Sequence, residues 1–365
     1  MPVMSLRDLR RSVGQLAIVG FGGHTLPEET RALARDFDLG GVIYFARNVD
    51  SPEQVEELSR QARGLARETP LWISVDQEGG RVARLKRPFT EWPPMMTLGR
   101  SGDDELAARF ARALARELRA VGINLDYAPV LDVHTNPDNP VIGDRAFAEK
   151  AEDVARISRV IIRALQSEGV AACGKHFPGH GDTSTDSHLE LPVLEHDKRR
   201  FEAVELLPFK AAVDEDVACI MTAHVLVPAY DADRPATLSP RLVDAVLKKQ
   251  LGYRGIVISD DLAMKAVSAT WELGESMVAA LAAGCDAVLL CDPKPDDQAA
   301  ALEAVIHAVE ARTLPLSRVE DALARQHRVK ARFLDPRAER KAPAFADVLG
   351  CADHQAVAEA MAAFR

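Results

Sequence analysis

The segment from Lys175 to Pro192, KHFPGHGDTSTDSHLELP, concentrates side chains that can transfer protons. Three histidines and two aspartates are mixed with proline and glycine residues that exclude a helix through its first half. Asp186 and His188 stand two residues apart, on the same side of an extended segment. The carboxylate can orient the imidazole and stabilise its charged form, which leaves the second ring nitrogen free to deliver or remove a proton. The pattern predicts an acid–base pair.

The same residue types could instead bind a metal ion, because histidine and aspartate are ligands of zinc and other transition metals. The proline and glycine between the histidines argue against a helical metal site of the usual spacing. A metal-dependent hydrolase nevertheless stays open as an alternative from another class.

Two further segments carry carboxylates after apolar runs. In GIVISDDLAM, one aspartate of the pair Asp260–Asp261 can attack an electrophile while the other caps the next helix. In SVDQEGGRVARL, Asp76 and Arg84 combine a carboxylate with a guanidinium, which suits recognition of sugar hydroxyls because both groups form paired, directional hydrogen bonds. A loop-stabilising ion pair is the alternative interpretation of Asp76 and Arg84.

The elements that must position these residues follow a rhythm of short apolar runs and segments with helical periodicity. The runs are apolar throughout, which indicates parallel strands covered by helices on the outside. Eight of them predict an α/β fold, a (β/α)8 TIM-type barrel; an open doubly wound sheet is the rival, but no G-x-G-x-x-G follows the first run. The predicted strands are Leu16–Val19, Val42–Phe45, Leu71–Val75, Leu125–Pro129, Val170–Cys173, Cys219–Thr222, Ile256–Ser259 and Ala287–Leu290.

Unusual polar residues follow the carboxyl ends of these predicted strands. Active sites of barrel enzymes form at that end, because the loops after the strands ring one mouth. We therefore expect a shared site there, built from Asp76, Asp132, Lys175, His176, His224, Asp260, Asp261 and Asp292.

The domain organisation is expected to be simple, with a catalytic barrel over residues 1–334 and a C-terminal extension over 335–365. Prolines interrupt the periodicity where the extension begins, and Asp353–Phe364 reads as a helix. The extension is too short to hold a core of its own, so we expect it to pack on the barrel.

The composition limits the possible binding partners and the cellular compartment of the protein. The net charge is −10 and the basic residues are scattered, which argues against nucleic-acid binding. The first residues, MPVMSLRDLRRSVG, lack the apolar stretch of a secretion signal, and no apolar run is long enough to span a membrane. Five cysteines without a CxxC pair predict reduced thiols, and together these features predict a cytoplasmic protein.

With these residues in view, the sequence resembles glycoside hydrolase family 3, in particular its single-domain bacterial β-N-acetylglucosaminidases of the NagZ type. The resemblance runs from about Gln15 to the tail, and its last three blocks are highly specific. It rests on QLAIVGFGG, GGVIYFARNV, SVDQEGGRVARL, YAPVLDV, NPVIGDRAF, KHFPGHGDTSTDSH and ISDDLAM, in that order.

The resemblance implies a role for each matching residue. Asp260 would attack the anomeric carbon, and His188, supported by Asp186, would protonate the departing oxygen. The residues implied to hold the N-acetylglucosamine ring are Asp76, Arg84, Arg145, Lys175 and His176, with His224 and Met264 near the pocket.

The implied activity is that of a retaining exo-β-N-acetylglucosaminidase with a covalent glycosyl-enzyme intermediate, no cofactor and no metal. The implied substrate is N-acetylglucosamine linked to 1,6-anhydro-N-acetylmuramic acid, with or without its peptide, in peptidoglycan recycling. We expect a monomer. Phosphorolysis is the nearest alternative, because neutral imidazole repels phosphate less than a carboxylate does. Another family 3 β-glycosidase and a non-catalytic sugar-binding barrel are further alternatives.

Overall fold

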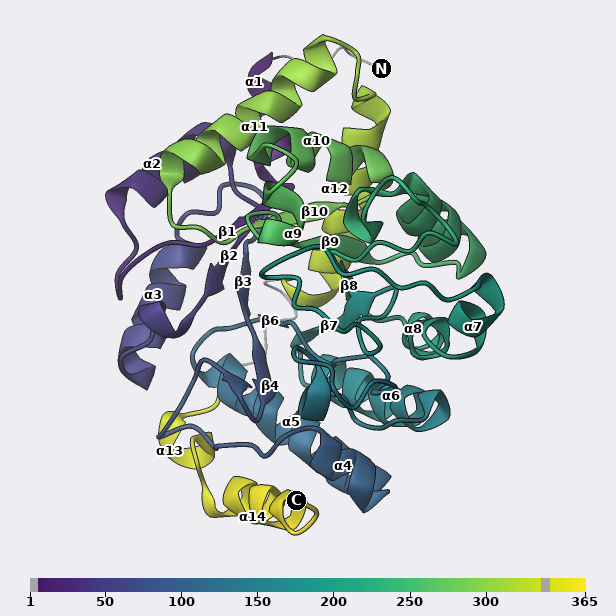
Figure 1. Cartoon of the computed structure of the whole chain (residues 1–365). Helices are drawn as coiled ribbons and strands as arrows, with labels where there is room; N and C mark the ends of the chain where they lie inside the picture. Colours follow the sequence, from purple (N-terminus) through teal and green to yellow (C-terminus); the bar gives the residue numbers. More distant parts are fainter. Residues whose placement is uncertain (1–5, 336–341) are drawn as a thin grey trace.

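The computed structural model describes residues 6–335 and 342–365, which form a closed barrel of eight parallel strands surrounded by helices (Figure 1). Around the barrel the strands run in the order β1-β10-β9-β8-β7-β6-β3-β2. The predicted TIM-type barrel is therefore confirmed, and the open doubly wound sheet is wrong. The strands are β1 (Ala17–Val19), β2 (Gly41–Tyr44), β3 (Trp72–Val75), β6 (Leu125–Asp126), β7 (Ala171–Phe177), β8 (Cys219–Thr222), β9 (Ile256–Asp261) and β10 (Ala287–Leu290).

The strands are apolar on both faces because they divide two hydrophobic cores. In β1, Ile18 belongs to the core inside the barrel, whereas Ala17 and Val19 pack in the core between the barrel and its helices. Alternate residues of a strand point to opposite faces, so a strand that separates two dry regions needs apolar residues at every position.

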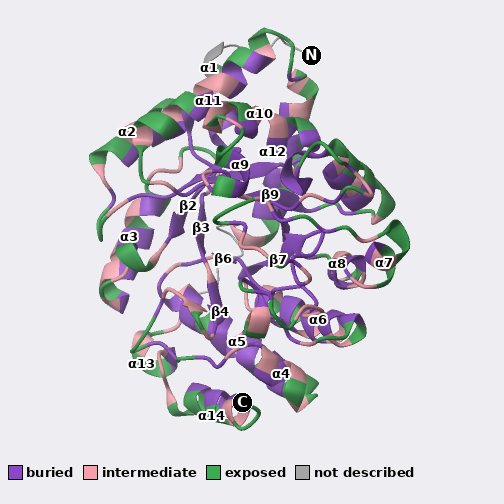
Figure 2. Ribbon diagram, viewed as in Figure 1, coloured by how far each residue is buried: buried purple, intermediate pink, exposed green. Residues whose placement is uncertain are grey.

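The surrounding helices turn one apolar side toward the strands, and Figure 2 shows their buried faces on the inside and their exposed faces outside. The Ser51 hydroxyl caps α3 by accepting the Gln54 N–H at 3.2 Å, as Ser-Pro at a helix start predicts. The longer helices are α1 (Leu6–Gly14), α2 (Glu28–Phe37), α3 (Pro52–Arg63), α5 (Asp104–Ala120), α6 (Ala151–Ser167), α8 (Leu206–Asp214), the π-helix η4 (Arg241–Gln250), α10 (Leu273–Ala283), α11 (Pro295–Glu310) and α12 (Leu316–Phe333).

Several short elements lie in the connections between the strands and the main helices. A two-stranded hairpin follows β3 directly and was not predicted from the sequence. The short elements are β4 (Gln77–Gly79), β5 (Val82–Ala83), η1 (Ala46–Asn48), α4 (Met96–Ser101), η2 (Gly143–Arg145), α7 (Lys198–Ala203), η3 (Ala236–Leu238) and α9 (Lys265–Ser268).

The C-terminal tail carries helices α13 (Phe345–Val348) and α14 (Ala352–Ala362), which lie against α4 and α5 (Figure 1). Glu117 of α5 anchors the tail, because its buried carboxylate accepts the Gly350 N–H at 3.2 Å and lies 2.9 Å from His354 Nδ1. Residues 1–5 and 336–341, which belong to the predicted barrel and extension, lie outside the described residues. The boundary between 334 and 335 stays a prediction.

The structure bears on the predicted reduced thiols and on the search for a membrane span. All five cysteines are free, and four of them are buried. Within the described chain, each helix is too short or too polar to cross a membrane.

Candidate active site

The largest concentration of predicted site residues surrounds a cavity of about 680 Å³ at the carboxyl ends of the strands. Side chains from segments far apart in the sequence meet there because each follows a different strand of the closed barrel. The predicted residues that line it are Asp76, Arg84, Arg145, Lys175, His176, Asp186, His188, Asp260, Asp261, Met264 and Asp292.

Asp260 is the penultimate residue of β9 and lines this cavity. Its Oδ1 accepts the backbone N–H of Asp261 at 2.8 Å. Burial opposes ionisation, but the electrostatic effect of the His224 and His176 rings outweighs burial and holds the pKa of Asp260 below its ordinary value. The group is therefore an anionic carboxylate over the physiological pH range.

The neighbouring Asp261 has a structural role. Its Oδ1 accepts the backbone N–H of Ala263 at 3.2 Å and that of Cys291 at 3.1 Å. These bonds fix the turn after β9 and tie it to the end of β10. Both residues line the cavity, but Asp261 accepts two backbone N–H groups, whereas Asp260 accepts one.

Asp186 and His188 form the hydrogen-bonded pair that their spacing predicts. The His188 Nδ1 atom lies 2.7 Å from Asp186 Oδ1, which also accepts the His188 backbone N–H at 2.8 Å. Burial would raise the pKa of Asp186, but these two bonds outweigh it and lower that pKa. With Nδ1 occupied by the carboxylate, Nε2 is the nitrogen left for proton transfer.

Lys175 is a buried cation held between two carboxylates. Its Nζ lies 2.7 Å from Asp76 Oδ1 and 2.6 Å from Glu78 Oε1. Burial would lower the pKa of Lys175, but Asp76 and Glu78 outweigh burial and raise that pKa above its ordinary value. Asp76 in turn lies 3.5 Å from Arg84, so the two predicted rim residues belong to one ionic network.

Glu78 belongs to this network and lines the cavity, although the sequence interpretation missed it. It is 2% exposed and holds Arg145 with two bonds, at 2.9 Å to Nε and 2.8 Å to the terminal nitrogen. Burial would raise the pKa of Glu78, but Arg145 and Lys175 outweigh burial and lower it strongly. The sequence could have indicated Glu78 as a site residue, because it stands two residues after Asp76 and alternate residues of an extended segment share a face.

His176 connects this network to Asp132 and, through Asp132, to His180. Its Nε2 lies 3.4 Å from Arg145, and its Nδ1 lies 2.7 Å from the buried carboxylate of Asp132. Asp132 also accepts the backbone N–H of His180 at 2.7 Å. Burial raises the pKa of Asp132, but His176 outweighs it, so that this carboxylate is ionised as well.

His224 and Met264 differ in their relation to the cavity. Met264 is 8% exposed and lines the wall. His224 is fully buried behind the end of β9 and is not among the lining residues. Its Nε2 donates to the Asp261 carbonyl at 2.9 Å and its Nδ1 lies 2.8 Å from Thr237 Oγ1. His224 therefore lies near the pocket as predicted, but outside it, where it bonds to the end of β9 and lowers the pKa of Asp260 electrostatically.

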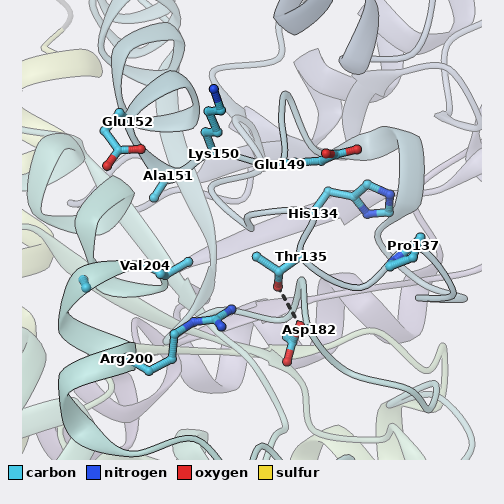
Figure 3. Close-up of a pocket in the computed structure, with 11 residues that line it drawn as sticks. His134, Thr135, Pro137, Glu149, Lys150, Ala151, Glu152, Asp182, Arg200 and Val204 are labelled. Atoms are coloured by element: carbon cyan, nitrogen blue, oxygen red, sulfur yellow. Dashed lines mark hydrogen bonds between the residues drawn. The ribbon is translucent and has the colours of Figure 1, made fainter.

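A second cavity, of about 580 Å³, is lined by the segment after β6, the start of α6 and helix α7, and Asp182 is its one residue from the Lys175–Pro192 segment (Figure 3). Thr135 donates a hydrogen bond to Asp182 there at 2.7 Å, and Asp182 also bonds to His196. Figure 3 shows the Arg200 guanidinium pointing toward Asp182, and none of the predicted site residues lines this cavity. The convergent groups therefore select the cavity at the barrel mouth as the candidate active site.

In the part of the chain that the structure describes, no three His, Cys, Asp or Glu side chains converge as a metal site requires. Within the Lys175–Pro192 segment, His176 and His188 bond to the carboxylates of Asp132 and Asp186, and His180 bonds to two hydroxyl groups.

The comparisons with known proteins give one consistent result. The family model "Glycosyl hydrolase family 3 N terminal domain" matches residues 8–329. A Beta-hexosaminidase of Nitrosomonas eutropha is 40% identical over 288 residues, which cover 77% of this chain and 82% of that protein. One of Bordetella pertussis is 42% identical over 288 residues, covering 77% and 81%.

Solved structures agree with the sequence relatives. A family 3 β-N-acetylglucosaminidase from a Paenibacillus species has a TM-score of 0.93 at 40% identity and covers 98% of this chain and 68% of that one. Native NagZ from Neisseria gonorrhoeae has a TM-score of 0.80 at 32% identity and covers 96% and 97%.

Proposed function

Because the chain belongs to glycosyl hydrolase family 3, we propose that it removes terminal β-linked N-acetylglucosamine through a covalent intermediate on Asp260. The family expected from the sequence is thereby confirmed. Relatives with 40% and 42% identity are named Beta-hexosaminidase, and the chain is a β-N-acetylhexosaminidase.

The observation that carries the mechanism is the convergence of an ionised Asp260 and the Asp186–His188 pair on one cavity. In the first step a carboxylate oxygen of Asp260 bonds to the anomeric carbon. The bond from that carbon to the aglycone oxygen breaks, and His188 Nε2–H protonates the departing oxygen. In the second step neutral His188 takes a proton from water. The water oxygen bonds to the anomeric carbon, and the ester to Asp260 breaks.

The sugar ring is held by the ionic network beside the nucleophile. Asp76 and Arg84 supply directional partners for hydroxyl groups at the rim. The buried carboxylates of Glu78 and Asp132 hold the donor groups of Lys175, Arg145 and His176 in place, so these side chains need little reordering when the substrate binds. Neisseria gonorrhoeae NagZ has been solved with N-trifluoroacetyl-D-glucosamine, which supports an N-acylated glucosamine as the sugar bound here.

The natural substrate that we propose is N-acetylglucosamine linked to 1,6-anhydro-N-acetylmuramic acid, with or without its peptide. The similarity to NagZ supports this place in peptidoglycan recycling, and the free cysteines suit a reducing cytoplasm. The expected monomer stays a prediction, which size-exclusion chromatography checks.

The central experiment measures hydrolysis of 4-nitrophenyl β-N-acetylglucosaminide by the wild type and by Asp260→Asn. We expect kcat to fall by at least ~10³-fold, because the variant lacks the group that forms the ester. Asp138→Asn, on an exposed aspartate in the loop after β6, is the matched control and should leave kcat unchanged. A variant of Asp260 with near-normal turnover would end the proposal.

Trapping identifies the nucleophile directly. A 5-fluoro N-acetylglucosaminyl fluoride keeps the acetamido group and slows breakdown of the glycosyl ester. Mass spectrometry of peptides should then find the sugar on Asp260. Modification of another carboxylate would contradict the assignment.

Two further assays address the alternatives. Reaction in phosphate buffer followed by analysis for sugar 1-phosphate separates phosphorolysis from hydrolysis. Loss of activity with a chelator, together with stoichiometric metal in elemental analysis, would favour the metal-dependent hydrolase.

A further inference from the structure

The proposed proton donor lies on a segment with few attachments. Residues 184–190 contain both Asp186 and His188, and His188 and Leu189 are 64% and 67% exposed. The hydrogen bonds of Asp186 and His188 join these two residues to each other or to their immediate neighbours. These local bonds shape a turn, but they do not fix the turn over the cavity.

The preceding half of the loop is firmly attached. Asp182 bonds to Thr135 at 2.7 Å and also to His196. The Thr183 carbonyl accepts the side-chain N–H of Asn136 at 3.0 Å. The chain is therefore held in place up to Thr183 and needs a second attachment further on if the proton donor is to be positioned.

Ser187 provides that attachment. Among the residues that the structure describes, the hydrogen bonds from 184–190 to the rest of the protein both come from this serine. Its Oγ lies 3.0 Å from His180 Nε2, and its carbonyl accepts the Ala266 backbone N–H at 3.3 Å. Ser187 is 2% exposed although it stands between two exposed or half-exposed residues of the acid–base pair.

The direction of the hydrogen bond between Ser187 and His180 follows from the surroundings of the imidazole. Thr183 Oγ1 donates to the His180 carbonyl at 3.0 Å, so at 2.7 Å from His180 Nδ1 the hydroxyl must accept the ring N–H. His180 Nε2 then carries the lone pair, and the Ser187 hydroxyl donates to it. Burial lowers the pKa of His180 to about 4, so the ring is neutral and keeps this lone pair near pH 7.

His180 is a rigid acceptor. It is 2% exposed, and its backbone N–H donates to the buried carboxylate of Asp132 at 2.7 Å. Asp132 also binds His176, which belongs to the network proposed to hold the sugar. The acceptor of the Ser187 hydroxyl is thus fixed to the same framework as the sugar site.

We propose that Ser187 is a positioning residue, whose hydrogen bond to His180 holds the Asp186–His188 pair over the substrate cavity. This inference rests on the proposed glycosidase function. It assigns to the middle residue of Asp-Ser-His a role in aligning proton transfer, although the serine itself need not contact the substrate.

A positioning role for Ser187 makes a distinctive kinetic prediction, because the first step uses the His188 imidazole as an acid and the second uses it as a base. A poor leaving group needs the proton of His188 in the first step, whereas 2,4-dinitrophenolate departs without it. Hydrolysis of the ester in the second step needs His188 as a base for every substrate. The value of kcat/KM reports the first step, and kcat for an activated substrate reports the second.

The test compares Ser187→Ala with the wild type on phenyl and 2,4-dinitrophenyl β-N-acetylglucosaminides. For the phenyl glycoside we expect kcat/KM to fall about tenfold, the factor that corresponds to roughly 1.4 kcal/mol for one net hydrogen bond. For the dinitrophenyl glycoside kcat and KM should fall together, so that kcat/KM stays within about twofold. Ser184→Ala, in the same segment but exposed, is the control and should match the wild type on both substrates.

An equal loss of kcat/KM on both glycosides, or no loss on either, would overturn the role of Ser187. A second measurement removes the acceptor: in a His180→Ala background, Ser187→Ala should produce no further selective loss. Should Ser187→Ala fail to fold, Ser187→Cys, with a weaker donor of similar size, is judged by the same criterion. A wild-type protein that cleaves neither glycoside would instead refute the proposed function.

Discussion

Replacement of Glu78 by glutamine tests the buried ionic network that the proposed mechanism depends on. The change removes one negative charge and keeps the shape of a side chain that is 2% exposed. Glu78 lies 2.6 Å from Lys175 and holds Arg145 through two bonds at 2.8 and 2.9 Å. A carboxamide offers one oxygen acceptor, and its NH2 group opposes the second cation.

The expected cost follows from the burial of the partners. Removal of one member of a buried ion pair typically costs about 3–5 kcal/mol, because the other charge stays buried without compensation. Lys175 keeps Asp76 at 2.7 Å, so part of the positive charge remains compensated. We therefore expect Glu78→Gln to lower the free energy of unfolding by about 3 kcal/mol, measured by urea denaturation at pH 7.

The same variant should bind substrate poorly. Arg145 and Lys175 lose the group that holds them side by side, so the donors proposed for the sugar are no longer pre-positioned. We expect KM for the aryl glycoside to rise at least about tenfold, with a smaller change in kcat, because the nucleophile and the acid–base pair are untouched.

The pH dependence of this stability difference has a defined sign. Because Arg145 and Lys175 lower the pKa of Glu78 in the folded protein, ionised Glu78 stabilises the fold fully above its ordinary value of 4.5. The contribution declines as the pH falls below 4.5, since the unfolded chain then binds the proton first. The gap between wild type and variant should therefore narrow from pH 5 to pH 3.

Glu57→Gln is a matched control for the network. Glu57 also lies 2.6 Å from a cation, Arg60, but the two side chains are 45% and 69% exposed. Solvent screens such a pair, and we expect no measurable change in the urea midpoint. The reasoning would be refuted if Glu78→Gln unfolded at the wild-type urea concentration, or if Glu57→Gln lost as much stability as Glu78→Gln.

Two further predictions concern stability. Glu117→Ala should lower the free energy of unfolding by ~3 kcal/mol in urea denaturation, because buried donors of Thr90 and the tail lose their acceptor; an unchanged midpoint would contradict the anchoring of the tail. Burial lowers the pKa of Lys330 to about 7, so between pH 7 and 10 the unfolded chain binds more protons than the folded one. Relative to Lys330→Met, the wild type should gain up to ~1.4 kcal/mol per pH unit as the pH rises, and a difference independent of pH would contradict this.

The amino-acid sequence by itself indicated parallel strands buried on both faces and the strand ends where the candidate site lies, whereas closure into a barrel came from the structure. Each of the eight predicted runs overlaps an observed strand. The pairing of Asp186 with His188 was also predictable, because residues two positions apart in an extended segment point to the same side of the chain.

Only the tertiary structure decided which partners complete the site. Glu78 meets Lys175 across 97 residues of sequence, and His180 meets the serine of the acid–base segment only because the loop folds back on itself. His224 follows its strand like the other site residues, yet it turns its nitrogens to Thr237 and the Asp261 carbonyl. Spacing along the chain fixes the direction of neighbouring side chains, whereas partners on different strands depend on barrel closure and loop packing, which no local pattern encodes.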